Sequence, residues 1–272
     1  MKKNEERPKI GIALGSGGAK GYSHIGILRA LEENNIKIDY LTGTSIGALV
    51  GALYAYHVDS KKVEKITITP RWQDIFSLTD TTLKGGIIKG SDIRKFINNN
   101  IDKADFKDLK IPFKILATDY KKGDRVELAS GSVASAVHAS IAFPFVFAPV
   151  NRGRKILWDG GLSDPVPVRT LDKMGADIII GVNLSNKSIL NGEEKPSINP
   201  YSVMIRSIKI LECNLANSNI SKADLIIEPE FDGTSFFKFH KVLKGEAAGF
   251  FDKGKKAMEE KMKSLEKIIA SF

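Results

Sequence analysis

Gly43-Thr44-Ser45-Ile46-Gly47 lies between a short β-like run, residues 36–41, and a helix-like run rich in alanine and leucine, residues 48–54. A serine between two glycines, at a turn from a strand into a helix, is the arrangement of a nucleophile elbow. The glycines allow a tight turn and leave the serine Oγ clear of neighbouring side chains. A plain Gly/Ser turn before a helix would have the same sequence, so this hypothesis needs support from the rest of the chain.

The composition indicates an ordinary globular protein. The chain has 272 residues, of which 42% are hydrophobic and 27% charged, enough to bury a substantial core. A single cysteine, Cys213, excludes an internal disulfide and suits a reducing compartment. Residues 1–9 are polar, and the longest apolar runs, 46–58 and 139–150, are too short to cross a bilayer. We therefore expect a cytoplasmic protein with no signal peptide or transmembrane segment.

The net charge of +9 arises from 41 basic and 32 acidic residues. The lysines are scattered through helical segments rather than clustered with aromatic residues, so we expect no nucleic-acid partner. A basic surface suits peripheral contact with an anionic membrane, but it serves solubility equally well. Charge alone therefore does not select a partner.

The order of predicted elements indicates an α/β fold. Residues 9–14 form a first strand that leads into a Gly-rich loop and a helix, and the second strand leads through Ser45 into another helix. Such a repeat predicts parallel strands with right-handed connections. No repeat or linker interrupts the chain, so we expect one domain over residues 1–272. Further strands are predicted at 112–119, 125–128, 155–158, 177–184 and 224–228, and further helices at 91–98, 132–138, 200–216 and 242–269.

The first loop is Gly15-Ser16-Gly17-Gly18-Ala19-Lys20-Gly21. It does not fit a dinucleotide fingerprint, because Lys20 stands where the third glycine belongs, and it lacks the Gly-Lys-Ser/Thr of a P-loop. Its amides could instead form an oxyanion hole at a helix N-terminus. Lys20 opposes the helix dipole, so we expect a nearby carboxylate or carbonyl, or an anionic head group, to hold its ammonium group.

A serine nucleophile needs a base. Of the four histidines, His240 lies where a Ser-Asp-His order would place the base, although the phenylalanines around it indicate packing. Asp159 follows the apolar run 156–158 and precedes Gly160 and Gly161, at a strand end where its carboxylate could project. An Asp-Gly turn is the commonplace interpretation of this pair. Burial would raise the pKa of Asp159 and make it a usable base.

Taken together, three motifs resemble, in order and spacing, the signatures of patatin-like phospholipases, and most closely those of the small bacterial members. They are the loop 15–21, the turn 43–47 and Asp159-Gly160-Gly161. Residues 24–28, 139–140 and 164–168 also resemble that family. The resemblance covers residues 10–170, with a weaker echo at 245–248, and leaves a C-terminal strand and helices in 171–272.

The resemblance implies a three-layer α/β/α sandwich with a mainly parallel central sheet, related to α/β hydrolases. It implies hydrolysis of lipid acyl esters, of the phospholipase A or lysophospholipase type, without a metal or other cofactor. Ser45 would be the nucleophile and Asp159 the proton acceptor. The amides of Gly17 and Gly18 would hold the oxyanion; Ser16, which replaces the first glycine of the family motif, would have a more restricted amide. Gly15, Lys20, Gly21, Gly43, Gly47, Gly160 and Gly161 would support the motifs.

Three alternatives remain at this point. The aromatic run Phe143, Phe145 and Phe147, with Ile141 and Val146, would either line an acyl site or pack in the core. The chain could be a non-catalytic membrane-associated or regulatory protein of the same fold. It could also be an esterase that uses a Ser-Asp-His triad with His240.

Overall fold

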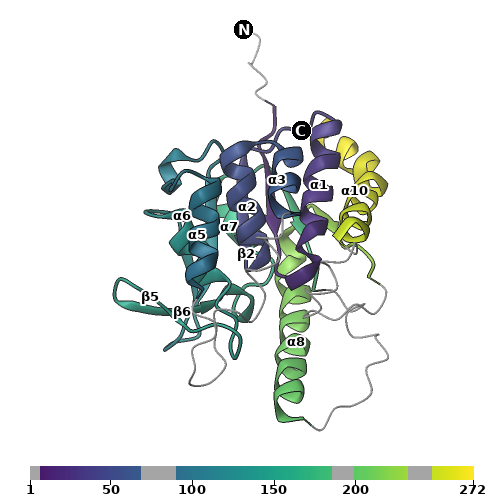
Figure 1. Cartoon of the computed structure of the whole chain (residues 1–272). Helices are drawn as coiled ribbons and strands as arrows, with labels where there is room; N and C mark the ends of the chain where they lie inside the picture. The colour runs from purple at the N-terminus through teal and green to yellow at the C-terminus, as the bar shows by residue number, and fades with distance from the viewer. Residues whose placement is uncertain (1–6, 69–89, 186–198, 232–246) are drawn as a thin grey trace.

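The computed structural model describes residues 7–68, 90–185, 199–231 and 247–272 (Figure 1). A mixed sheet runs through the molecule in the order β5-β6-β3-β2-β1-β7-β8, with β4 paired to β3. Within this order, the five neighbouring strands β3, β2, β1, β7 and β8 are parallel to one another. Their bounds are β1 Ile10–Leu14, β2 Tyr40–Thr44, β3 Phe113–Asp119, β7 Ile178–Val182 and β8 Leu225–Ile227.

Strands β1 and β7 are apolar along their whole length because both faces of the sheet are covered. Every residue of β1 and β7 is buried. Side chains alternate between the faces: Ile178 and Ile180 join the larger apolar cluster, whereas Ile179 joins a smaller one. Val166 and Leu171 are in that smaller cluster, so the loop after Asp159 and the helix that follows it form part of the core.

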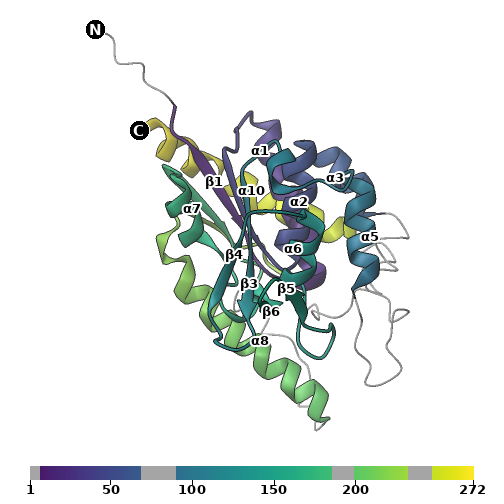
Figure 2. The ribbon, with the colours of Figure 1, turned by 90° about the vertical axis from the view of Figure 1, so that its left-hand side faces the viewer.

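Helices cover both faces of the sheet (Figure 2). The expected α/β/α arrangement with a mainly parallel central sheet is therefore confirmed. On one face lie α1 (Tyr22–Glu33), α2 (Ile46–His57), α3 (Ser60–Thr67), α5 (Ser91–Asn100), α6 (Val133–Ser140) and α10 (Ala247–Ala270). On the other lie α7 (Val168–Met174) and α8 (Pro200–Asn219). The helix α7 is not among the predicted elements.

An antiparallel extension at the β3 side of the sheet brings Asp159 to the end of β2. It consists of β4 (Arg125–Leu128), β5 (Val150–Arg152) and β6 (Lys155–Asp159). On β3, Leu116 pairs with Thr44 of β2, and the next residue, Ala117, pairs with Asp159 of β6. One edge of β3 pairs with β4. Along the other edge, β2 pairs with the first part of β3 and β6 pairs with the last part. Asp159 therefore lies beside the turn that follows Thr44.

In the described ranges, no helix combines the length and the apolar character needed to cross a bilayer. The C-terminal helix, α10, packs along α1 (Figure 1). A Cβ added to Gly26 of α1 would collide with the Phe251 carbonyl of α10, so a glycine is required for the two backbones to approach this closely.

Candidate active site

Ser45 occupies a strained turn between β2 and α2. Its φ of 53° and ψ of −120° lie in a region that a residue with a side chain rarely adopts. The Ser45 amide donates to Ser140 Oγ at 2.8 Å, and the Ser140 hydroxyl donates to the Leu116 carbonyl at 2.5 Å. At Gly47 a Cβ would collide with the Leu14 carbonyl of β1. These contacts hold the strained geometry that presents the Ser45 hydroxyl.

The Ser45 hydroxyl donates to Oδ2 of Asp159 at 2.7 Å. The other carboxylate oxygen, Oδ1, accepts the Gly161 amide at 2.7 Å, and Thr118 Oγ1 donates to the Asp159 carbonyl at 2.7 Å. Asp159 is only 2% exposed. Burial first, and then the charge of Glu212, raise the pKa of Asp159 from 3.8 to about 8. A carboxylate with this pKa is suited to accept a proton near neutral pH.

Two of the histidines are bound to backbone carbonyls. Nε2 of His24 lies 2.8 Å from the Gly15 carbonyl, and Nε2 of His57 lies 2.8 Å from that of Asn100. Burial lowers the pKa of His24 to about 4, so this ring is neutral at physiological pH. His240, the alternative base, lies outside the described residues. Among the residues that the structure describes, the partner of the Ser45 hydroxyl is the carboxylate of Asp159.

The Gly-rich loop is fixed to the β1 end and to the loop after Asp159. The Gly15 amide donates to the Val182 carbonyl at 3.1 Å, and the Ser16 amide donates to the Pro165 carbonyl at 2.9 Å. Because the Ser16 amide is already used, the structure argues against Ser16 as an oxyanion donor. Gly17 and Gly18 differ: within the described part of the chain, their amides have no acceptor.

The 3-10 helix Gly18–Gly21 brings this loop against the elbow. A Cβ on Gly21 would collide with the side chain of Ile46, the residue after Ser45. Gly18 has φ of 58°, in the left-handed region that favours glycine. Two amides without acceptors among the described residues thus lie in a loop that contacts the turn of Ser45.

Lys20 has no carboxylate or carbonyl partner among the described residues, contrary to that part of our expectation. Its side chain is buried, and Nζ lies 4.7 Å from the centre of the Phe231 ring. Burial and the charge of Lys209 lower the pKa of Lys20 to about 7, while Glu212 acts against them. The amine of Lys20 is therefore buried against an aromatic ring and loses its proton more readily than an exposed lysine does.

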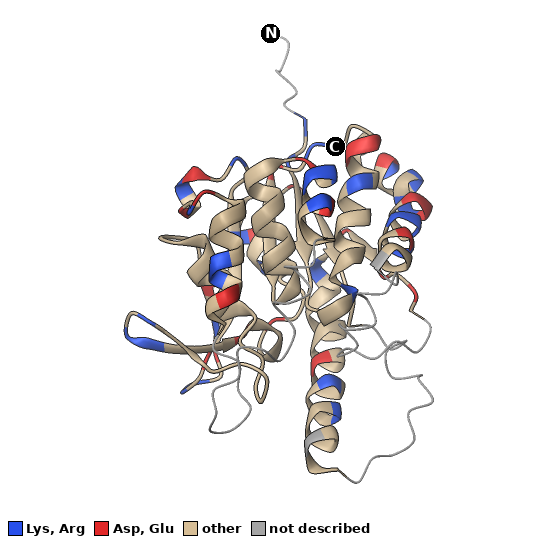
Figure 3. Ribbon diagram, viewed as in Figure 1, with Lys and Arg blue, Asp and Glu red and all other residues tan. Residues whose placement is uncertain are grey.

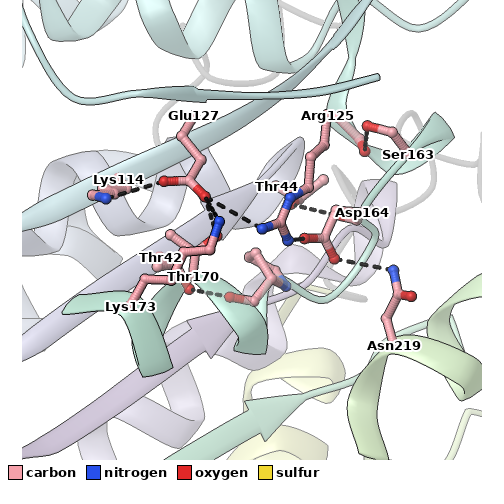
Figure 4. A network of polar contacts seen from close by, with 12 residues as sticks. Thr42, Thr44, Lys114, Arg125, Glu127, Ser163, Asp164, Thr170, Lys173 and Asn219 are labelled. Atoms are coloured by element: carbon pink, nitrogen blue, oxygen red, sulfur yellow. Dashed lines mark hydrogen bonds and ion pairs between the residues drawn. The ribbon is translucent and has the colours of Figure 1, made fainter. Parts of the chain in front are cut away.

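A polar network secures the loop after Asp159 (Figure 4). The buried carboxylate of Asp164 accepts from Nη1 of Arg125 and from Nδ2 of Asn219, each at 3.1 Å. Its carbonyl accepts from Thr44 Oγ1 at 2.8 Å. Arg125 also pairs with Glu127 at 3.5 Å. Strands β2 and β4 and helix α8 are thereby joined to the loop that sets the position of Asp159.

The aromatic run after α6 is mostly core. Ile141, Phe143 and Phe147 are buried in the large apolar cluster, whereas Phe145 is 45% exposed. The structure thus favours core packing for the three buried side chains.

Three residues at the site were not assigned a role from the sequence. They are Ser140, which accepts the Ser45 amide, Thr118, which donates to the Asp159 carbonyl, and Glu212. Glu212 carries a signal that sequence could have supplied. It is a charged residue on the buried face of α8, together with Ile205, Cys213 and Ala216. In the described ranges, no three His, Cys, Asp or Glu side chains are grouped as a metal site would require.

The patatin-like phospholipase family model matches residues 12–172, more than half of the chain. An uncharacterised NTE family protein of Mycobacterium tuberculosis is 35% identical over 180 residues, which cover 65% of this chain and 49% of that protein. A lysophospholipase of Pyricularia oryzae is 33% identical over 183 residues, covering 65% of this chain and 12% of that protein. The matched region thus spans about half or less of these relatives' lengths.

The crystal structure of VipD from Legionella pneumophila has the same fold. It superposes with a TM-score of 0.54 at 15% identity, over 94% of this chain and 67% of that one. The family match extends from β1 through the elbow and the Asp-Gly-Gly turn into α7. The chain belongs to the patatin-like phospholipase family.

Proposed function

We propose that the chain is a serine acyl hydrolase of lipids that uses Ser45 and Asp159 as a catalytic dyad. The 2.7 Å hydrogen bond from Ser45 Oγ to Asp159 Oδ2, at a buried elbow, carries this proposal. The lysophospholipase named among the relatives favours lysophospholipids as the substrate class.

In the first half of the reaction, Asp159 takes the hydroxyl proton as Ser45 Oγ attacks the ester carbonyl. The amides of Gly17 and Gly18 donate to the oxyanion of the tetrahedral intermediate, where each donor stabilises by roughly 3 kcal/mol. Asp159 then gives its proton to the leaving alcohol, and an acyl-enzyme remains. Water then loses a proton to Asp159 and attacks the carbonyl of this ester. As the bond from Ser45 Oγ to the acyl carbon breaks, Asp159 returns the proton to Ser45 Oγ, and the fatty acid is released.

The surface that would meet a lipid aggregate is the outward face of α8. This helix extends beyond the rest of the molecule (Figure 1). None of its exposed side chains that the structure describes is charged, and its cations Arg206 and Lys209 are half-buried. Val203 is 48% exposed and Leu211 is 68% exposed. By contrast, α10 carries interleaved basic and acidic residues (Figure 3), and its Lys256 pairs with Glu260. An uncharged helix face with exposed apolar side chains, on a protein of net charge +9, suits an anionic lipid surface.

Release of fatty acid from purified lysophospholipids tests the activity. We expect turnover by the wild type and by Ser271→Ala, which removes an exposed hydroxyl bonded to the Ile268 carbonyl. We expect none by Ser45→Ala. Undiminished release by Ser45→Ala would contradict the proposal, as would the absence of release from every acyl ester offered to the wild type.

Sedimentation with phosphatidylglycerol vesicles tests the membrane contact separately. Leu211→Asp should reduce the bound fraction, because it places a charge in the apolar face of α8. The matched control is Ile68→Asp, at an apolar side chain that is 55% exposed beyond the end of α3. Equal losses in both variants, or no loss in Leu211→Asp, would contradict a role for α8.

A further inference from the structure

A third carboxyl group lies beside the dyad. Glu212 comes from α8, is only 6% exposed, and faces the Asp-Gly-Gly turn. A Cβ added at Gly161 would lie 2.7 Å from Oε1 of Glu212 and 3.1 Å from Oδ1 of Asp159. Both carboxyl groups therefore flank the same side of Gly161, in a region that is closed to solvent.

Glu212 also contacts the Gly-rich loop. Ser16 Oγ donates to Oε1 of Glu212 and lies 3.3 Å from Ser185 Oγ. The amide of Ser16 donates to the Pro165 carbonyl, whereas the amide of the next residue, Gly17, has no acceptor in the described part of the chain. One side chain of α8 thus contacts the loop of the oxyanion donors and borders the turn of the base.

The charges around Glu212 favour its ionised form more than those around Asp159 do. Burial raises the pKa of Glu212, but the hydroxyl of Ser16 and the cations Lys209 and Lys20 lower it. Asp159 has neutral donors, Ser45 and Gly161, and the like charge of Glu212. When the first of the two protons leaves this pair of acids, the negative charge is therefore more stable on Glu212 than on Asp159.

We propose that Glu212 is a positioning residue of the dyad: its negative charge makes Asp159 a stronger base, and its bond to Ser16 holds the Gly-rich loop. This inference rests on the proposed function. A carboxylate that faces a second carboxylate in a buried site gains a proton more readily, because protonation removes the repulsion. That gain assists the transfer of the Ser45 proton at the moment of attack.

The pH dependence of kcat/KM for a soluble short-chain ester, in Glu212→Gln and wild type, tests the inference. Glutamine keeps the size and can still accept from Ser16, but it lacks the charge. We expect the acid limb to move to lower pH by about one unit. We also expect the plateau kcat to fall several-fold, with little change in KM, because a weaker base accepts the proton less readily.

Two further variants separate charge from structure. Glu212→Asp keeps the charge, so its acid limb should stay within about 0.3 unit of the wild type even if the plateau falls. Glu260→Gln removes an exposed carboxylate on α10 and should change nothing. Thermal melting of each variant checks that it is folded.

An unchanged acid limb in folded Glu212→Gln would overturn the inference, as would a limb that moves to higher pH. If Glu212→Gln does not fold, Glu212→Asp still decides: a downward move of about one unit there would overturn the inference. Activity in Ser45→Ala or Asp159→Asn would refute the dyad itself. If those variants are inactive and the Glu212→Gln limb does not move, the role of Glu212 alone fails.

Discussion

Asp159 and Asp164 lie five positions apart in the same turn, and each is 2% exposed. Asp159 is bonded to a hydroxyl and an amide, Ser45 and Gly161, and faces Glu212. Asp164 is bonded to the guanidinium of Arg125 and the amide of Asn219. The two carboxylates are equally buried, but only Asp164 has a cation as a direct partner.

In the proposed mechanism, one turn would hold both a reactive and a structural carboxylate. Burial raises the pKa of each. For Asp164, Arg125 and Asn219 act against burial and limit the rise to about 6. For Asp159, the charge of Glu212 adds to burial, and the pKa reaches about 8. A carboxylate that is bonded to a cation stays ionised and holds its neighbours. A buried carboxylate that has only neutral donors keeps the higher proton affinity that base catalysis needs.

The largest contrast should appear in activity. Asp159→Asn removes the base while keeping the shape, so kcat should fall by roughly 10²- to 10⁴-fold. Asp164→Asn leaves the dyad intact, and we expect less than about a tenfold loss at a temperature where it is folded. Ester hydrolysis by the two purified variants gives the comparison. Comparable losses in both would contradict the division of roles between the two residues.

The second contrast concerns stability. Asp164→Asn leaves the partly buried guanidinium of Arg125 with Glu127 as its remaining anionic partner and should lower the free energy of unfolding by about 1–3 kcal/mol. Asp159→Asn should not lower it, because the amide replaces a carboxylate that is costly to bury. Urea denaturation followed by circular dichroism measures both. A clear loss of stability in Asp159→Asn would indicate that this carboxylate, too, has a structural role.

A third contrast should follow pH. The raised pKa of Asp159 means that the folded state binds more protons than the unfolded state between pH 3.8 and about 8. Its contribution to the free energy of unfolding therefore falls as pH rises through this range. The stability of Asp159→Asn relative to wild type should accordingly increase from pH 5 to pH 8. A difference that is constant with pH would contradict the raised pKa.

The sequence was most informative where structure is local. Parallel strands buried on both faces are continuously apolar, so β1 and β7 were predictable, together with the helices that follow β1 and the Ser45 turn. The second strand was predicted at residues 36–41, but β2 runs from Tyr40 to Thr44. The serine turn between two glycines predicted the elbow. In each case, residues close in the chain determine the geometry.

The parts that were not predicted depend on contacts between distant segments. That β6 replaces β2 along one edge of β3 depends on pairing among three strands, so the position of Asp159 beside Ser45 followed only from the family resemblance. The hydrogen bond from the Ser16 amide to the Pro165 carbonyl joins two loops that are far apart in the chain. The role of Ser140 beneath the elbow is equally non-local.

The central claim is that Ser45 is a nucleophile activated by Asp159. The most direct test is the rate of covalent labelling by an alkyl fluorophosphonate, with the modified residue identified by peptide mass spectrometry. We predict one adduct, on Ser45, in the wild type and no adduct in Ser45→Ala. Labelling of Asp159→Asn should be at least about 100-fold slower, since the hydroxyl keeps its proton. An adduct on another residue of Ser45→Ala, or labelling of Asp159→Asn at the wild-type rate, would contradict the dyad.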